Sequence, residues 1–257
     1  MDFNGFDENF ALTGKTALVT GAGAGIGEAI ALMFARKGAD IVLVDLNRDA
    51  CEKVAGVIKG YGRKTLVLAG DITDNANIRA FVAEAAKAMS RIDVLVNCAG
   101  VALLEDAEKI SEDAWYKTIN LNLSASFFMA QEVGKVMIRQ GGGKIINMAS
   151  QAALVSLDRH VAYNSSKAGI LAMTKVLACE WAEFGIQVNA ISPTVILTEL
   201  GKKAWAGEVG EAMKKKIPAR RFGYPEEVAA AAVYLASQAA DLVTGSNLVI
   251  DGGYTVQ

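Results

Sequence analysis

The sequence has few of the residues that would tie it to a metal, to an extracellular scaffold or to a membrane. It contains one histidine and three cysteines, Cys51, Cys98 and Cys179, which are far apart and lack metal-ligand spacing. An odd number of separated cysteines is typical of free thiols in a reducing compartment. No basic segment followed by an apolar run opens the chain, and no stretch of about 18 uncharged apolar residues occurs in it. We therefore expect a cytoplasmic protein that has no metal site and does not cross a membrane.

Proline and net charge are scarce as well. Only three prolines occur in 257 residues, no Pro- or Ser-rich linker interrupts the chain, and 52% of the residues are hydrophobic. These features predict a single domain over residues 1–257. The formal net charge is −2, and the basic run Lys214–Lys216 is typical of a solvated helix face. We expect no binding to nucleic acid or to an anionic membrane.

Short β-branched apolar runs alternate with longer segments of helical period, such as Glu28–Arg36, Ala76–Met89 and Glu226–Ala236. Near-continuous apolar runs indicate strands buried on both faces, as in a parallel sheet covered by helices. Right-handed crossovers then predict an α/β, single-domain, doubly wound (Rossmann) fold with a parallel sheet of about seven strands flanked by helices. The expected strands are Thr16–Thr20, Asp40–Asp45, Thr65–Leu68, Val94–Asn97, Lys144–Asn147, Gln187–Ile191 and Asn247–Ile250.

Two segments fall outside this alternation. Residues 1–13 precede the first expected strand and are predicted to form a loosely attached N-terminal arm. Residues 198–221 make an unusually long connection between a strand and a later helix. A long insertion at such a place is a candidate substrate lid.

A glycine-rich turn links the first expected strand to the first helix. Its sequence is Thr20-Gly21-Ala22-Gly23-Ala24-Gly25-Ile26-Gly27, and such glycines let the backbone approach a pyrophosphate at a helix N-terminus. The second strand ends in Asp45, 18 residues after Gly27. A carboxylate there can accept the ribose hydroxyls of NAD and repels the 2′-phosphate of NADP. A solvent-facing turn aspartate is the alternative, and the neighbouring Arg48 could instead serve a phosphate.

The catalytic candidates follow the fifth expected strand. Ser150 is followed thirteen residues later by Tyr163 and four residues after that by Lys167. In a helix the last two lie on one face. A free phenol has a pKa of about 10, which a nearby ammonium and a positively charged nicotinamide ring lower, so Tyr163 can exchange the proton of a carbinol hydroxyl. Ser150 is placed to hydrogen-bond the substrate oxygen.

Together these residues resemble the short-chain dehydrogenase/reductase family. Other parts of the resemblance are Asn97-Cys98-Ala99-Gly100, Asn122 and Pro193–Thr198, and it runs from about Gly14 to Tyr254. Two residues depart from the family pattern: Cys98 replaces a commoner Asn, and Thr194 replaces a Gly and narrows the nicotinamide end of the pocket.

The resemblance implies a catalytic tetrad in which Asn122 joins Ser150, Tyr163 and Lys167 and holds a water in a proton relay. Asn120 is an alternative for that fourth position. The family also implies a homotetramer, whereas the choice of NAD as the cofactor depends on the Asp45 carboxylate. The implied cofactor-binding residues are Gly21, Gly25, Ile26, Gly27, Asp45, Asp71, Ile72, Asn97, Gly100, Tyr163, Lys167, Ile196 and Thr198.

Three residues suggest the substrate. Gln151, His160 and Trp205 resemble residues that line the sugar pocket in the polyol dehydrogenase and L-xylulose reductase-like branch. With Ser150 and Tyr163 they form the predicted substrate site for a small polyol or its ketose, because amide, imidazole and indole groups suit several hydroxyls and a carbon face. Each also has a structural alternative: a loop histidine, a packed helix tryptophan, or a glutamine paired with backbone.

Two other functions stay open at this point. A reductase of 3-oxoacyl thioesters or of other ketones would use the same tetrad with an open apolar channel. A non-catalytic NAD-binding regulator is disfavoured, because such proteins usually lose the Tyr or the Lys, and both are present here.

Overall fold

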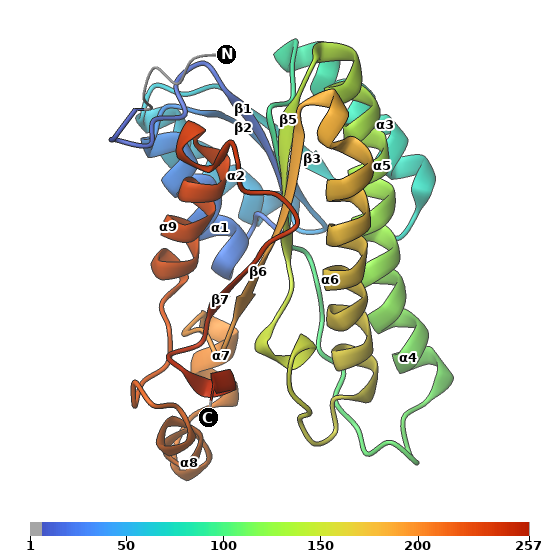
Figure 1. Ribbon diagram of the computed structural model, residues 1–257, viewed down its shortest axis with the longest axis vertical. Coiled ribbons are helices and arrows are strands. Elements are labelled where there is room, and N and C mark those ends of the chain that lie inside the picture. Colours follow the sequence, from blue (N-terminus) through green and yellow to red (C-terminus); the bar gives the residue numbers. More distant parts are fainter. Residues whose placement is uncertain (1–6, 257) are drawn as a thin grey trace.

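A wholly parallel, seven-stranded sheet lies between two layers of helices in the computed structural model, which describes residues 7–256 (Figure 1). The strand order is β3-β2-β1-β4-β5-β6-β7, so the chain winds outward in one direction from the middle and then in the other. This confirms the doubly wound fold, including its seven strands. Their bounds are β1 Thr16–Thr20, β2 Asp40–Asp45, β3 Thr65–Ala69, β4 Val94–Asn97, β5 Gly143–Met148, β6 Ile186–Pro193 and β7 Asn247–Ile250.

The helices divide between the two faces of the sheet. One face is covered by α1 (Gly25–Arg36), α2 (Arg48–Gly60) and α9 (Pro225–Ala236). The other is covered by α3 (Asn75–Met89), α5 (Ser126–Gln140) and α6 (Val161–Trp181) (Figure 1). The helix α4 (Glu112–Ile119) continues through a π-helical turn, Asn120–Ala125, into α5. The short helices α7 (Glu199–Ala204) and α8 (Glu208–Lys216) lie within the insertion that was expected to form a lid.

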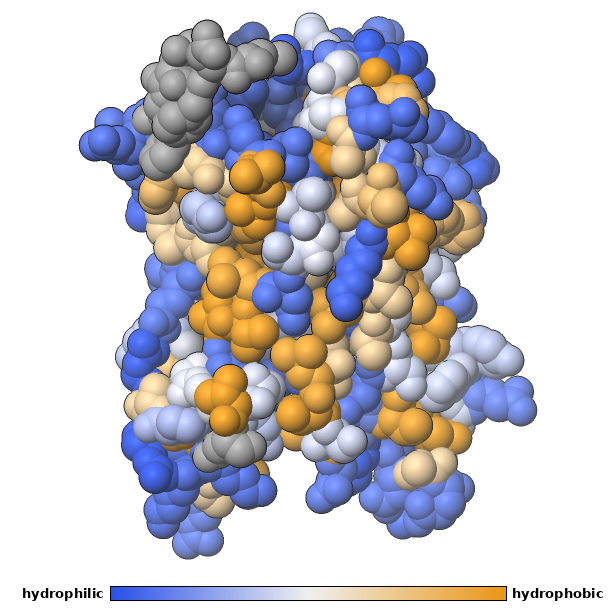
Figure 2. Space-filling model, viewed as in Figure 1, coloured by the Kyte–Doolittle hydropathy of each residue, from blue (hydrophilic) through white to orange (hydrophobic). Residues whose placement is uncertain are grey.

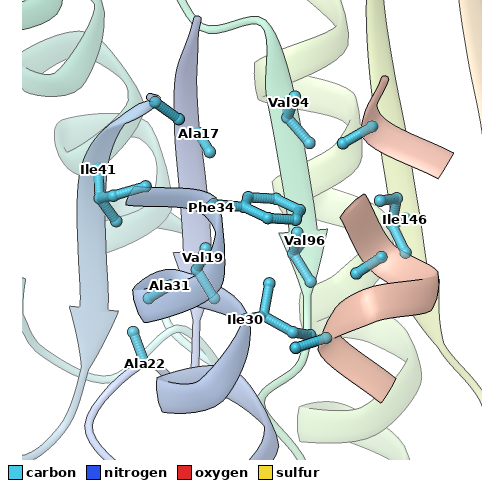
Figure 3. Packing of buried hydrophobic residues seen from close by; sticks show 14 of the residues in the cluster. Ala17, Val19, Ala22, Ile30, Ala31, Phe34, Ile41, Val94, Val96 and Ile146 are labelled. Carbon is cyan, nitrogen blue, oxygen red and sulfur yellow. The ribbon is translucent and has the colours of Figure 1, made fainter. Parts of the chain in front are cut away.

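The apolar character of the strands explains the layered core. In β1 all five residues are buried, and in β4 all four, because helices cover both faces. Figure 3 shows the ring of Phe34, from α1, lying across β1 and β4 near Val96. This ring is fully buried, and burying a phenylalanine side chain stabilises a fold by about 2–3 kcal/mol.

The carboxyl ends of parallel strands share one edge of the sheet, and ligands of such folds bind in the crevice outside that edge. The strand order reverses between β1 and β4, and the motifs of the sequence lie on the connections that leave β1, β4, β5 and β6 there. Figure 2 shows the molecule hollowed at its lower edge, between the lobe of α7 and α8 and the lobe on the side of α4 and α6. The fold therefore brings the predicted site residues to one end of the molecule.

The N-terminal arm differs in part from the expectation. Residues 1–6 of it lie outside the described residues. Further along, Leu12 is buried in the core and its N–H donates to the carbonyl of Lys37 at 2.7 Å. The ring of Phe10 packs edge-on against Tyr234, with ring centroids 6.2 Å apart. The described end of the arm is thus packed on α1 and α9 because two of its side chains are large and apolar. Over residues 7–256 no helix has the length and apolarity needed to span a membrane.

Candidate active site

The glycine-rich turn brings the end of β1 close to the start of α1. Gly21 and Gly25 have φ angles of +67° and +60°, which favour glycine. A Cβ atom on Gly27 would lie 2.1 Å from the carbonyl oxygen of Gly21, so no larger residue fits there without a backbone shift. Ala24, at the N-cap, provides no side-chain acceptor for the first N–H groups of α1. The turn can therefore present backbone N–H groups to an anion, with Ile26 in the first turn of the helix.

The carboxylate of Asp45 is held beside this turn. One of its oxygens accepts a hydrogen bond from the N–H of Gly23 at 3.0 Å, and the other accepts from the N–H of Asn47 at 2.9 Å. Arg48 pairs at 3.9 Å with Glu52, one turn further along α2. The charge next to the glycine-rich turn is therefore negative, which suits ribose hydroxyls better than a phosphate.

The next strand end contributes Asp71 and Ile72. The N–H of Gly70 donates to the carbonyl of Asp45 at 3.0 Å, so the ends of β2 and β3 are tied together. Asp71 is exposed and accepts the N–H and the hydroxyl of Thr73, each at 2.8 Å, whereas Ile72 is buried. These residues follow Gly70 and so lie near Asp45 along the edge of the sheet.

Tyr163 and Lys167 lie one turn apart on α6, as their spacing predicts. The Lys167 ammonium is 5.7 Å from the centre of the Tyr163 ring and donates to the carbonyl of Met148, at the end of β5, at 2.6 Å. Ser150 follows that strand and hydrogen-bonds the Tyr163 phenol. Its own oxygen accepts the N–H of Ala152 at 3.1 Å, which fixes the hydroxyl in place. The three groups therefore converge where β5 ends against α6.

Burial shifts both ionisable groups of this cluster. It raises the pKa of Tyr163, while the hydrogen bond from Ser150 acts in the opposite direction. Burial also lowers the pKa of Lys167 to about 8. The lysine thus holds its proton at neutral pH and can release it slightly above. The raised pKa of Tyr163 differs from the lowering expected from a nearby ammonium, because desolvation of the buried phenol is the larger effect in the protein alone.

Asn122 completes the cluster from the π-helical turn, and Asn120 is exposed. The Asn122 side chain accepts from the N–H of Val101 at 2.8 Å and donates to the carbonyl of Val101 at 2.9 Å and to the hydroxyl of Ser166 at 3.1 Å. A Cβ atom on Gly100 would lie 3.0 Å from the Asn122 oxygen and 3.7 Å from the Lys167 nitrogen. The structure therefore brings Asn122, Gly100 and Lys167 together.

The insertion after β6 faces the glycine-rich turn. Thr198 caps α7 by accepting the N–H of Gly201 at 3.0 Å, and its methyl group would lie 3.0 Å from a Cβ atom on Gly25. Ile196 is buried and forms a short parallel bridge with Gly223. This arrangement brings the start of the insertion against the glycine-rich turn at the edge of the sheet.

The three predicted substrate residues are placed differently from one another. Gln151 is buried directly after Ser150. The ring of His160 lies 6.0 Å from that of Tyr163, edge to face, and its Nδ1 is 2.5 Å from the carbonyl oxygen of Asp158. Trp205 packs against Phe222, with ring centroids 6.0 Å apart, in a small hydrophobic cluster that joins the insertion to its flanking segments. His160 is thus beside Tyr163, Gln151 directly follows Ser150, and Trp205 packs in this hydrophobic cluster.

Known proteins are similar to this chain over nearly its whole length. A family model described as enoyl-(acyl carrier protein) reductase matches residues 21–255. An NAD-dependent glycerol dehydrogenase of Listeria innocua is 59% identical over 257 residues, which is 100% of both chains. A D-threitol dehydrogenase of Mycolicibacterium smegmatis is 54% identical, covering 98% of this chain and 96% of that one. The crystal structure of an NAD+-bound xylitol dehydrogenase superposes with a TM-score of 0.90 at 30% identity, covering 94% of this chain and 99% of that one.

The chain belongs to the short-chain dehydrogenase/reductase family. It is an oxidoreductase that acts on alcohol groups. The two departures from the family pattern can now be placed. Cys98 is a neutral thiol near the catalytic cluster, because burial raises its pKa to about 12 and the Lys167 charge lowers it only in part. Thr194 lies just beyond β6, where its N–H donates to the carbonyl of Ile250 at 3.0 Å.

The hydrogen bonds of the Asn97 side chain could not be predicted from the family motif. Its amide nitrogen donates to the side-chain oxygen of Asn147 at 2.9 Å and to the carbonyl of Ser126 at 3.0 Å. Its side chain therefore links β4 and β5 to α5 within the interior.

Sequence reasoning missed two hydroxyl residues that position the site. Thr20 accepts the N–H groups of Cys98 and Ala99 at 3.0 and 3.1 Å, which ties β1 to the end of β4. The hydroxyl of Ser166 accepts a hydrogen bond from the Asn122 amide and donates one to the carbonyl of Tyr163 at 2.7 Å. Their only signal is position, since Thr20 opens the glycine-rich turn and Ser166 precedes Lys167.

Proposed function

We propose that this protein oxidises a small polyol to its ketose or other carbonyl product with NAD, and that Tyr163 is the acid/base group. The observation that carries the proposal is the meeting of the Tyr163 phenol with the Ser150 hydroxyl and the Lys167 ammonium at the sheet edge. Relatives named as glycerol and D-threitol dehydrogenases support the choice of polyol.

The residues at the edge of the sheet fit NAD. The tight glycine-rich turn stands at the N-terminus of α1, where free N–H groups suit a pyrophosphate, and a Cβ atom on Gly27 would clash with the carbonyl oxygen of Gly21. The anchored Asp45 carboxylate suits two ribose hydroxyls. Bound NAD supplies the hydride acceptor. The residues that would hold it are Gly21, Gly25, Ile26, Gly27, Asp45, Asp71, Ile72, Gly100, Tyr163, Lys167, Ile196 and Thr198.

The catalytic residues then divide the work on the alcohol. Ser150 donates a hydrogen bond to the substrate oxygen and orients the carbinol. Tyr163 takes the hydroxyl proton as the carbinol becomes a carbonyl, and bound NAD would accept the hydride from the carbinol carbon, so that one O–H and one C–H bond break and a C=O bond forms. Lys167 stabilises the phenolate that accepts the proton. Asn122, held by Val101, keeps the neighbouring backbone in place for proton release to water.

A thioester or other ketone reductase is the second candidate, and the description of the matching family model favours it. A bulky acyl chain needs an apolar channel, whereas the imidazole of His160 lies beside the Tyr163 ring and the polar Gln151 directly follows Ser150. The deciding experiment is a panel of glycerol, D-threitol, xylitol, galactitol and glucitol with NAD, set against acetoacetyl thioester with NADH, both followed at the NADH absorbance. We expect turnover of polyols. Turnover of the thioester alone would overturn the proposal.

We further propose a homotetramer in the cytoplasm. On α6, Val161 and Val176 are exposed, and the edge strand β7 has all four residues half-buried. In Figure 2, hydrophobic residues gather on the face over β7 and α9. An apolar face of this kind fits contact with further copies of the chain. The three cysteines are free thiols, which supports a reducing compartment. Light scattering tests the assembly, and a monomer would contradict it.

A further inference from the structure

Four side-chain oxygens on α6 or near the ends of β4, β5 and β6 are enclosed but have no hydrogen-bond partner within the described part of the chain: Oδ1 of Asn97, Oε1 of Gln151, Oδ1 of Asn164 and Oγ1 of Thr194. Gln151 and Thr194 follow neighbouring strands, at the edge of the sheet where Ser150 also lies. An enclosed polar atom without a partner costs folding free energy, and in native proteins such an atom calls for an explanation, often a role in function. The carbonyl oxygen of Gln151 can accept a hydrogen bond, and the hydroxyl of Thr194 can accept or donate one.

The topology places these two atoms on adjacent segments. Strands β5 and β6 are neighbours, with Met148 opposite Ile191, and the N–H of Ala149 donates to the carbonyl of Ile191 at 2.8 Å. The chain therefore leaves both strands side by side. Gln151 comes three residues after the end of β5, and Thr194 comes one residue after the end of β6.

The strand period places Thr194 on the catalytic side of the sheet. Side chains of a strand alternate between faces. In β6, Ala190 packs with Ile170 of α6, whereas Ile191 belongs to the core on the opposite face. Thr194 follows Ala190 by four residues and is still held in the ladder by its bond to Ile250. It therefore lies on the face covered by α6, which also carries Tyr163.

We propose that Thr194 is a specificity-determining residue that selects vicinal diols. Its hydroxyl and the carbonyl oxygen of Gln151 bind the hydroxyl group on the carbon next to the reacting carbinol, while Ser150 and Tyr163 bind the reacting hydroxyl. This inference rests on the proposed polyol oxidation. A substrate without the neighbouring hydroxyl leaves both oxygens unpartnered, and sites built to bind a hydroxyl discriminate strongly against analogues that lack it.

The test uses Thr194→Val, which keeps the shape of the side chain and removes the hydroxyl, and Thr194→Ser, which restores it. Glycerol, propane-1,2-diol and propan-2-ol form the substrate series, because they have two, one and no hydroxyl groups next to the secondary carbinol. Initial rates with NAD are followed at the NADH absorbance. We expect Thr194→Val to lower kcat/KM for glycerol and for propane-1,2-diol about tenfold, and to change kcat/KM for propan-2-ol by no more than about twofold. Thr194→Ser should keep kcat/KM for glycerol and the diol within about threefold of the wild-type value.

Two further measurements separate this role from others. Thr194→Val is expected not to lower the melting temperature, because the enclosed hydroxyl has no partner in the protein and its burial costs folding free energy. It is also expected to keep the Kd for NAD measured by fluorescence. A lower melting temperature or a weaker Kd would assign the hydroxyl to the fold or to the cofactor and overturn the inference. Unchanged selectivity in an active variant would overturn it alone. A wild-type protein that oxidises no polyol would overturn the proposed function together with it.

Discussion

Exchange of Asp45 for asparagine provides a quantitative test of the cofactor site. The Asp45 carboxylate accepts hydrogen bonds from Gly23 and Asn47 at 3.0 and 2.9 Å, which aim it beside the glycine-rich turn. Asparagine keeps the shape and one acceptor but removes the charge. A hydrogen bond to a charged group contributes about 1 kcal/mol more than a neutral one, so NAD loses about that much. Removing one charge repulsion at about 4 Å in a water-like dielectric helps NADP by about 1 kcal/mol. The two effects together lower the preference for NAD by about 30-fold.

The assay compares kcat/KM for NAD and for NADP at a saturating polyol concentration. Asp49→Asn is the matched control, because Asp49 is an exposed acid in the first turn of α2, close along the chain but not held against the turn. We expect the control to change the NAD/NADP ratio by no more than about twofold. An unchanged ratio in Asp45→Asn, or an equal shift in both variants, would refute the assignment of Asp45 to the ribose.

Three other substitutions test the site through their effects on activity, NAD binding and the stability of the fold. Gly27→Ala should weaken NAD binding and lower the melting temperature, because its Cβ atom would lie 2.1 Å from the carbonyl oxygen of Gly21; a wild-type Kd and melting temperature would contradict this. Lys167→Met should abolish activity yet raise the unfolding free energy at pH 7 by about 1–2 kcal/mol. Burial lowers the pKa of Lys167 from 10.5 to about 8, so keeping the buried ammonium charged at pH 7 destabilises the native state. Lys167 loses its proton near pH 8 in the native protein but only near pH 10.5 in the unfolded chain. The stability gained by Lys167→Met is therefore full below pH 8 and disappears as the pH rises to 10.5. Urea unfolding at pH 7 and pH 10 measures this gain, and a gain that increases with pH would contradict the lowered pKa. Asn122→Ala removes three hydrogen bonds, two of them to Val101, and should lower the unfolding free energy by about 2 kcal/mol and abolish most of kcat. A variant with wild-type kcat and wild-type stability in urea would argue against the role of Asn122.

The strands and the catalytic helix were predictable because their signals are local. A buried parallel strand requires a run of apolar residues, and β1 and β4 are buried throughout. The four-residue spacing of Tyr163 and Lys167 places them on one helical face regardless of their surroundings, and the structure shows both beside Ser150.

Other features depend on contacts between distant segments, which no local pattern carries. Asn122 lies in the π-helical turn, and its side-chain amide hydrogen-bonds the backbone of Val101, 21 residues earlier in the chain. The side chain of Asn97 lies in an interior network with Asn147, although its motif belongs to the cofactor region. The expected loose arm is packed at Leu12, because an apolar residue before the first strand can still reach the core.

The Tyr163→Phe variant tests the central claim most directly. The measurement is kcat for polyol oxidation, followed at the NADH absorbance, together with the Kd for NAD in the same sample. Phenylalanine keeps the ring and removes only the hydroxyl that exchanges the proton, so we predict an unchanged Kd and a kcat lower by about 10²–10⁴-fold. A variant that binds NAD and oxidises the polyol within a few-fold of the wild-type rate would contradict the role of Tyr163 and the mechanism built on it.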